Sequence, residues 1–559
     1  MSRRRAIQHG LGATGAGVLL GAFATSRSAS RAMQGSVATP ARSPVELPQP
    51  RVLKSAGGEL AVTLTATPAT VDMGAPLPVQ TYTFDNVVPG HTWEINPGDT
   101  LRVALVNNLP PLSHPEPMAF TRPHEWTTTN LHTHGLHVSP AGNADNIFIS
   151  IPPGETFHYE IAVPGDHPSG FYWYHPHRHG GVAQQVRAGM AGAIIVRGEL
   201  DEVEEVRAAK EQVMVLQAIE LGDELQLLDP IPRPDEHQAF YPREHILYTI
   251  NGVLNPRITM YPAEDQRWRM VNAAEGKFMS LQLEDHDLNV LAWDGLTLAA
   301  PEAAGLVLLS SGNRVEALIK AGQPGTYRLV LTPGSSQKPN IPGMPAPAHP
   351  SATPVATAAP TAVPAAPASP TAMAEMPGMA PMPGLIDIPG ELAVRPILAI
   401  EVVGDGPEMS LPAALPAWNP PMLPIAKTRT FAFTVERGPD NIEFLDFGVD
   451  GHAYDRDRPP YQVKLGTAEE WTLINGIDPR YPDHAHVYHI HTNPFKITRI
   501  NGRTLARPLW RDTFVLSGKN GDSITFESNF EDFTGKFVEH CHVLTHEDLG
   551  MMSAIEVIE

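Results

Sequence analysis

Cysteine is almost absent from this sequence, because Cys541 is the only one among 559 residues. One cysteine cannot form an internal disulfide, so the chain must be stabilised in other ways. Long apolar runs are also missing: the apolar run near the N-terminus is too short to span a bilayer, and we expect no stable membrane span. Basic residues are outnumbered, with 40 lysines and arginines against 61 acids, and the net charge of −21 excludes nucleic acid as a partner.

The turn-forming residues are abundant instead, with 46 glycines and 57 prolines. Between them lie short and often alternating apolar stretches such as TLRVALVNN and DSITFES, which are typical of half-buried antiparallel strands. The length allows several domains, each with its own core. We therefore predict an all-β protein with several domains.

The first residues have the pattern of an export signal, which we assign to residues 1–32. Three arginines at positions 3 to 5 precede a Gly/Ala-rich apolar stretch, and the small-x-small triplet Ala22-Phe23-Ala24 follows. The arginines resemble the twin-arginine signal, which carries folded proteins, although an ordinary secretory signal is the alternative. Either way we predict an exported protein, periplasmic or extracellular. A free thiol is a liability outside the cytoplasm, so Cys541 is expected to have a specific role.

Composition divides the rest of the chain into three strand-rich regions and one low-complexity segment. We predict a first domain at 45–200, a second at 205–335 and a third at 391–559. Residues 336–390 are rich in proline and alanine and cannot bury enough apolar surface to fold, so they are a linker or an insertion.

Histidines supply the strongest signal. Four His-x-His pairs occur, two near each end of the chain. On an extended strand, residues two apart point the same way, so each pair offers two imidazoles to one metal site. One pair would be weak support for a metal, whereas four are difficult to explain otherwise. The pairs are His132/His134, His175/His177, His489/His491 and His540/His542.

The lone cysteine lies inside the last of these pairs. Strand alternation directs His540 and His542 to one side and Cys541 to the other, so one strand would serve two metal sites. A thiolate with imidazoles and a weak thioether is the ligand set of a blue copper site. His486 and His546 are the candidate imidazoles.

Two neighbouring methionines compete for the axial position of that site, Met551 and Met552. Zinc is an alternative metal, although zinc sites with one cysteine and so many histidines are unusual. A binuclear hydrolase is a second alternative, but it would want bridging carboxylates and typically a β/α barrel, which this chain does not predict.

At this point the sequence resembles the three-domain bacterial multicopper oxidases, the laccases and cuprous oxidases. Its four motifs appear in order as HTHG, WYHPHRHG, HVYHIH and HCHVLTHEDLGMM. The stretches DNIFISIPPGETFHYEIAVPGDHPSGFYWYHPH and FTGKFVEHCHVLTHEDLGMM are also similar to bacterial members. The resemblance covers nearly the whole mature chain and implies three cupredoxin-like Greek-key β-sandwich domains.

The resemblance also implies four copper ions and assigns a ligand to each position. The motifs lie in the first and last regions, so a trinuclear cluster would form between those two domains, and the middle domain would act as a spacer. The third motif departs from the usual form at Val487-Tyr488 and Thr492-Asn493, which makes the surface facing the substrate less predictable. The assignments are His486, Cys541, His546 and Met551 for type 1 copper; His132 and His489 for type 2; and His134, His175, His177, His491, His540 and His542 for the type 3 pair.

In such an enzyme electrons enter singly at type 1 copper, pass through Cys541 to His540 or His542, and reduce dioxygen to two waters. Proton donors are then needed near the cluster, and the family places them at positions that match Asp145 and Glu547. A solvated surface carboxylate is the alternative for either residue. Five further histidines are expected to be non-ligands: His137, His158, His167, His179 and His484.

Methionines recur every third residue in TAMAEMPGMAPMPG, at Met373, Met376, Met379 and Met382. Thioether sulfur prefers copper(I), and cuprous oxidases of the family carry similar insertions, so these residues could recruit copper(I), with Asp483 helping to dock the cation. A disordered linker with incidental methionines is the alternative.

The predicted function is an oxidase of phenols, aromatic amines or copper(I), with dioxygen as electron acceptor, acting as a monomer. Two other classes compete with it. One is a silent envelope scaffold with the same fold, against which the complete ligand set argues, and the other is a copper-storage or copper-carrying protein.

Overall fold

The structure is a computed structural model. It describes residues 44–113, 121–230, 245–262, 264–332, 385–387, 394–404, 410–437, 445–478 and 485–559. Residues from Pro44 to Glu559 form one compact unit. Six sheets make up nearly all of its regular structure and pack as three pairs, which confirms the predicted all-β class. Among the described residues, no helix has the length and apolarity needed to cross a membrane.

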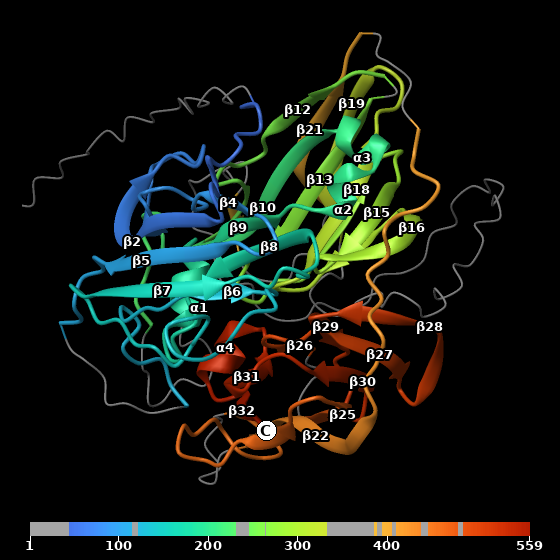
Figure 1. The fold of residues 1–559 in the computed structure, drawn as a ribbon. Helices are drawn as coiled ribbons and strands as arrows, with labels where there is room; N and C mark the ends of the chain where they lie inside the picture. Colours follow the sequence, from blue (N-terminus) through green and yellow to red (C-terminus); the bar gives the residue numbers. More distant parts are fainter. Residues whose placement is uncertain are drawn as a thin grey trace, which may run out of the picture. The chain divides into compact units, whose positions relative to one another are not determined.

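The first pair of sheets comes from the N-terminal third, blue to cyan in Figure 1. Residues of β5 alternate between buried and partly exposed, as the stretch TLRVALVN predicts for a strand with one face in a core. That core includes Trp93, Leu101 and Ile194 from both sheets. One sheet has the order β1 (Val52–Lys54), β4 (Thr92–Ile95), β9 (Gly192–Val196), β8 (Gly170–His175) and β6 (His132–His134); the other has β3 (Val79–Phe84), β2 (Glu59–Val71), β5 (Thr100–Asn107) and β7 (Thr156–Ala162).

The middle pair, green to yellow apart from the orange strands β20 and β21, encloses a second core around Trp268 and Met279. Its central strand β13 is buried along its whole length. The larger sheet has the order β16 (Leu296–Ala304), β15 (Leu288–Trp293), β18 (Arg314–Lys320), β13 (Asp265–Asn272), β10 (Lys210–Leu221), β11 (His245–Ile250) and β20 (Leu385–Asp387); the smaller has β12 (Arg257–Met260), β21 (Arg395–Val402), β19 (Gly325–Leu331), β14 (Met279–Leu283) and β17 (Val307–Leu309).

The third pair, orange to red, encloses the core that contains Cys541 together with Phe433, Trp471 and Phe526. One sheet has the order β23 (Leu445–Val449), β22 (Ile425–Arg437), β25 (Thr467–Ile477), β30 (Ser523–Phe530), β27 (Phe495–Ile500) and β28 (Arg503–Arg511); the other has β24 (Tyr461–Lys464), β32 (Met552–Ile558), β31 (Gly535–Cys541), β26 (His486–Ile490) and β29 (Thr513–Leu516).

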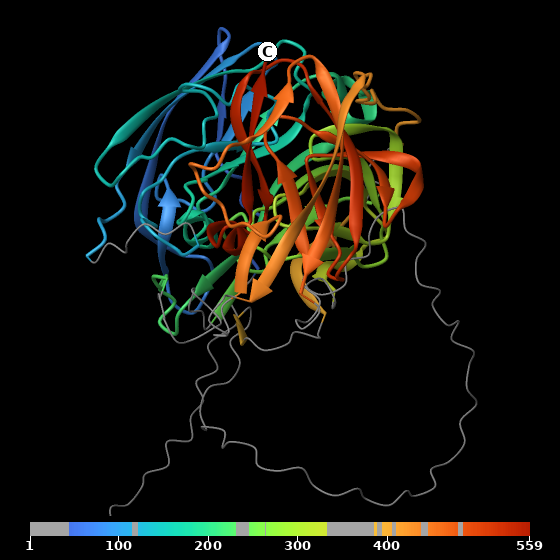
Figure 2. The same ribbon diagram turned by 90° about the horizontal axis from the view of Figure 1, so that it is seen from below.

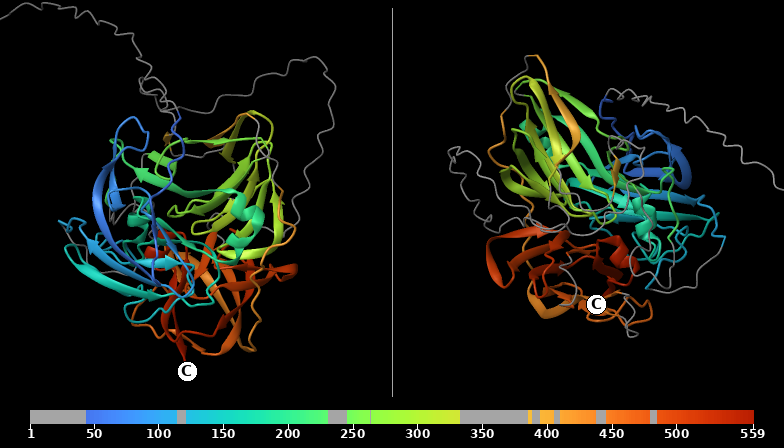
Figure 3. Two further views of the ribbon diagram at one scale, coloured as in Figure 1. Left: turned by 45° about the horizontal axis from the view of Figure 1, so that its top comes forward. Right: turned by 180° about the vertical axis from the view of Figure 1, so that it is seen from behind.

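Strands of the third pair lie beside both other pairs in every view (Figures 1, 2 and 3). Two short helices, α1 (Val182–Arg187) and α4 (Leu544–Asp548), join the first pair to the third through a small apolar cluster. The Asp548 carboxylate accepts hydrogen bonds from the N–H groups of Gly180 and Ala183, at 2.5 and 2.9 Å. The other helices among the described residues are α2 (Glu199–Glu202) and α3 (Glu204–Ala208).

Strand β21 lies beyond the predicted start of the third domain at residue 391. It pairs with β12 and β19, so its hydrogen bonds place it in the middle pair of sheets, and we draw that boundary after Val402. The segment predicted as 336–390 therefore connects strands of one pair, which fits an insertion. Most of that segment, and the export signal at 1–32, lie outside the described residues.

Candidate metal centres

All eight histidines of the His-x-His pairs gather in one buried group, and none is more than 2% exposed. Within each pair the ring centroids are 5.1 to 5.7 Å apart, so both rings lie on the same side of the backbone. Rings from opposite ends of the chain also stack: His132 on His491 at 3.9 Å and His134 on His489 at 3.8 Å. The group therefore forms where the first and third pairs of sheets meet.

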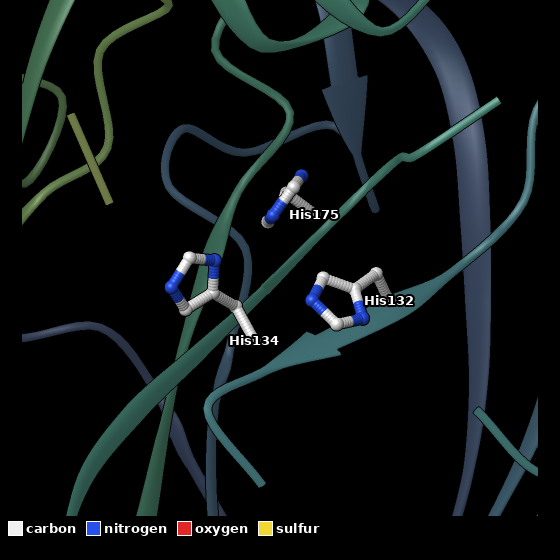
Figure 4. A group of neighbouring side chains, drawn as sticks. All are labelled: His132, His134 and His175. Carbon is white, nitrogen blue, oxygen red and sulfur yellow. The ribbon is translucent and has the colours of Figure 1, made fainter. Parts of the chain in front are cut away.

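Strand register explains part of this convergence. On β6 and β8, His132 lies opposite His175, and on β26 and β31, His489 lies opposite His540. Figure 4 shows the rings of His132, His134 and His175 around a common space. One ligand atom from each of these three lies within 4.8 Å of the others, which is close enough for one metal ion.

In three of the histidine rings the Nδ1 atom has a polar partner, which leaves the Nε2 atom available to bind a metal ion. The Nδ1 atoms of His175 and His489 donate to the carbonyl oxygens of Pro176 and Asp512, at 2.7 and 2.8 Å. His132 Nδ1 lies 2.9 Å from an Asp145 carboxylate oxygen. A carbonyl only accepts, so Nδ1 must carry the proton and Nε2 keeps its lone pair, the arrangement of a metal-binding histidine.

Four Nε2 atoms of the histidine group have no hydrogen-bond partner among the described residues. The Nε2 atoms of His132, His175, His489 and His542 are buried, and none has a hydrogen-bond partner among the described residues. Burial lowers the pKa of all four imidazoles well below the usual value, with neighbouring histidines adding to the effect, so all four rings are neutral and could bind a metal ion. Buried polar atoms without partners are costly, and a metal ion would satisfy them.

A second set of nitrogens converges in the same group. His177 Nε2 lies 3.1 Å from His491 Nε2 and 3.2 Å from His540 Nε2. These three residues also meet the distance criterion for one metal ion. Neutral imidazoles with their Nε2 atoms facing one point are the donor set that copper accepts.

The lone cysteine belongs to a separate group. Its sulfur lies 3.6 Å from the Nδ1 atom of His486 and 3.6 Å from that of His546. All three residues are buried, and the N–H of Val487 donates to the sulfur at 3.5 Å. Burial raises the pKa of the Cys541 thiol to about 12, so a bound metal ion is needed to make it a thiolate at neutral pH.

The competing methionines lie in different places. Met551 belongs to the same apolar core as Cys541, whereas Met552 packs with Ile147 and Tyr454 in another cluster. Met552 also pairs with His540 across β31 and β32, which directs its side chain away from the cysteine. This placement favours Met551 as the axial ligand.

The two predicted proton donors lie against the histidines. Asp145 is 6% exposed and also accepts from the N–H of Thr133 at 3.0 Å. Glu547 is fully buried, with one oxygen 3.0 Å from His540 Nδ1 and the other 3.4 Å from His177 Nδ1. Burial raises the pKa of each carboxyl to about 7. Neither is a solvated surface carboxylate, so that alternative is wrong for both.

Several residues around the histidines were not predicted. Arg314 of β18 is fully buried and holds the Asp512 carboxylate with two hydrogen bonds, at 2.8 and 2.6 Å. Thr513 lies 3.1 Å from His134 Nε2, and Ser311 lies 3.1 Å from His542 Nδ1. Ser311 and Arg314 come from the middle sheets, and no local sequence pattern marks them.

We expect Arg314→Met to destabilise the folded protein by about 3–5 kcal/mol, because it leaves the Asp512 carboxylate buried without its cation. Urea unfolding of the copper-free protein measures this effect. Arg328→Met is the matched control: its pair with Glu284 is exposed, so little change is expected. Equal unfolding curves for the two variants would contradict the importance of the buried pair.

Four of the five histidines predicted as non-ligands are described, and none of these four belongs to the metal groups found among the described residues. His137, for example, contacts the carbonyl of Thr492 and the carboxylate of Asp532, both at 2.7 Å. His484, Asp483 and the four methionines of the Met-rich segment lie outside the described residues.

Comparison with known proteins gives consistent matches. Three family profiles, each described as "Multicopper oxidase", match residues 123–201, 230–348 and 420–559. Together they cover more than half of the chain.

One curated relative and two solved structures illustrate the similarity. Multicopper oxidase mco of Staphylococcus haemolyticus is 21% identical over 475 residues, covering 84% of this chain and 82% of that protein. The multicopper oxidase of Campylobacter jejuni, described as a metallo-oxidase, superimposes with a TM-score of 0.65 at 21% identity, covering 92% of this chain and 96% of that one. A laccase from Pediococcus acidilactici gives a TM-score of 0.67 at 19% identity, with coverages of 92% and 94%.

Proposed function

Because this chain belongs to the multicopper oxidase family, we propose that it oxidises its reductant one electron at a time and reduces dioxygen to two waters. The observation that carries the proposal is the placement of two metal groups on opposite faces of β31. Cys541 faces the group of His486 and His546, and the neighbouring His540 faces the group of His177 and His491.

The buried donors fit copper in number and type. His486, Cys541, His546 and Met551 would hold type 1 copper, and His132 and His489 would hold type 2 copper. The two type 3 ions would take the other six histidines, three of which already converge through their Nε2 atoms. Copper bound in these sites supplies the one-electron redox chemistry and the capacity to reduce dioxygen.

The protein itself provides the electron path. From the Cys541 sulfur the covalent path runs through its own backbone to the adjacent residues, and their imidazoles belong to the other group. No electron needs to cross solvent between the groups, because every residue on the path is buried. The short path and the low exposure both favour fast transfer.

Protons come from the two buried carboxyls. Glu547 contacts His540 and His177, and Asp145 contacts His132, so each acid lies beside a different part of the histidine group. Without copper, burial holds the pKa of both carboxyls near neutrality, where a carboxyl can release and recover a proton. Bound copper would lower that pKa.

Copper content and catalytic turnover distinguish this proposal from the other two classes. A silent scaffold would purify without the full copper complement, and a storage protein would bind copper without consuming dioxygen. Steady-state dioxygen uptake with copper(I) and with dimethoxyphenol, compared on one preparation, tests the oxidase and ranks its reductants. Absence of uptake with every reductant by copper-loaded protein would contradict the proposal.

We further propose copper(I) as a reductant, on the basis of the methionine spacing in the sequence. Changing Met373, Met376, Met379 and Met382 together to serine should weaken copper(I) oxidation at low concentration, because thioethers prefer that ion. Oxidation of a bulky phenol should be unchanged or faster. Paired dioxygen-uptake assays measure both, and unchanged rates with both reductants would make the segment a tether and the enzyme a laccase.

The basic and then apolar start of the chain supports export to the periplasm or beyond, and a monomer is the expected form. Fractionation of cells that produce the intact chain would test export. Replacing Arg4 and Arg5 with lysine would test whether export uses the twin-arginine route.

A further inference from the structure

The middle pair of sheets contacts the segment that joins Cys541 to His546. Residues between β13 and β14 supply that contact, and Glu275 is its centre. The N–H of Leu544 donates to the Glu275 carbonyl at 2.9 Å, and the N–H of Thr545 donates to its carboxylate at 2.8 Å. The Thr545 hydroxyl donates to the same carboxylate oxygen. Three hydrogen bonds from two consecutive residues therefore end on one glutamate.

Packing around these hydrogen bonds is close. Glu275 is 6% exposed, and Leu544 is fully buried. Gly276 lies directly against Val543: a Cβ atom at this glycine would be 2.9 Å from a Val543 methyl carbon, closer than real contacts allow. The two segments thus fit together without room for a shift of either one.

Helix α4 needs such support because it has only five residues. So short a helix is not stable alone, and its first N–H groups have no partner within the helix. Glu275 binds two of those groups, at Leu544 and Thr545. His546 follows immediately in the chain, and Phe447 stacks on its ring with the centroids 4.4 Å apart. Phe447 thus packs against the His546 ring, and Glu275 holds the two residues that precede His546 in the chain.

We propose that Glu275 is a positioning residue for the cysteine-containing metal site, acting through Thr545 to hold His546 at its distance from Cys541. This inference rests on the proposed function, and it adds a role for the middle sheets. None of the predicted copper ligands comes from those sheets, yet they would set the geometry of the site where electrons are taken up.

Charge is the rival explanation, since a carboxylate near a metal site also acts through its field. The variants Glu275→Gln and Glu275→Ala separate the two. Glutamine keeps an oxygen that accepts both hydrogen bonds from Thr545 but lacks the charge. Alanine lacks the charge and also loses the two hydrogen bonds. Positioning predicts that glutamine behaves like the parent protein, and a field effect predicts that glutamine behaves like alanine.

The experiment uses copper-loaded full-length protein and reads the visible absorption band, the copper hyperfine splitting in electron paramagnetic resonance and copper retention against a chelator. Glu275→Ala should shift the band and the splitting and weaken copper binding at this site about 10- to 100-fold, as changes behind metal ligands do. Glu275→Gln should match the parent protein in all three. Glu284→Ala, which removes a half-exposed glutamate paired with Arg328, is the control and should change nothing.

Thr545→Val provides a second test should Glu275→Ala fail to fold. It removes only the hydroxyl donor, and the same three readouts should shift less than with alanine at 275. Parent-like spectra for Glu275→Ala or for Thr545→Val, or an alanine-like spectrum for Glu275→Gln, would overturn the positioning role. A parent protein without the intense visible band would instead overturn the proposed function.

Discussion

Cys541→Ser is expected to abolish the intense visible band and the oxidase activity of the copper-loaded protein. The sulfur lies equally far, at 3.6 Å, from Nδ1 of His486 and of His546, and serine cannot supply the polarizable thiolate on which the colour and the electron path depend. The fold should persist, at a cost of about 1–3 kcal/mol for a hydroxyl in an apolar core. Absorption spectroscopy, dioxygen uptake and urea unfolding measure the three effects.

Met551→Leu is the matched control for this change. It alters the same buried core but leaves the thiolate and both imidazoles, and the axial thioether is a weak ligand. The band and the activity should survive in this variant. A visible band that persists in Cys541→Ser would show that the type 1 assignment is wrong.

Glu547→Gln is expected to slow the reoxidation of reduced enzyme by dioxygen about 10²- to 10⁴-fold, the usual contribution of a positioned proton donor. The carboxyl lies between His540 and His177, fully buried, and glutamine has the same shape without a transferable proton. Reduction of the enzyme by its substrate should be unchanged, since that step consumes no proton at this position. Stopped-flow measurements separate the two steps.

The neighbouring acid gives the control for this prediction. Asp548→Asn removes a buried charge of the same helix whose carboxylate accepts from Gly180 and Ala183. It should lower the stability of the contact between α1 and α4 without a selective effect on reoxidation. Reoxidation of Glu547→Gln at the parent rate would remove this residue from the proton path.

Local pattern was sufficient to predict that the paired histidines and the cysteine would form two groups of side chains, and the structure brings them together in two buried groups. A His-x-His pair carries its own geometry, because alternate residues of an extended chain face one way, and the measured ring separations agree with that reasoning. The single cysteine inside such a pair implied two faces and two groups, and β31 has this arrangement. The all-β class followed from turn residues and alternation.

Residues that support the donors could not be predicted in this way. Arg314, Ser311 and Glu275 come from the middle sheets and their connections, and they contact Asp512, His542 and Thr545 across sequence separations of 198, 231 and 270 residues. Such contacts depend on tertiary packing and leave no periodic trace. The predicted start of the third domain at residue 391 differs from the boundary drawn after Val402 for a similar reason. Strand β21 belongs to the middle sheets because it pairs with β19, which its composition does not reveal.

The histidine group joins residues from the two ends of the chain, for example His177 and His540, which are 363 positions apart. A copper ion held there has more donors in the folded arrangement than in the unfolded chain, where each His-x-His pair is alone, so it shifts the folding equilibrium toward the folded state by mass action. Each tenfold rise in free copper above the dissociation constant then adds at most about 1.4 kcal/mol to the stability of the folded state, because copper bound by the unfolded chain reduces the gain. In a chain without disulfides, copper supply becomes a determinant of how long the protein survives heat and proteases.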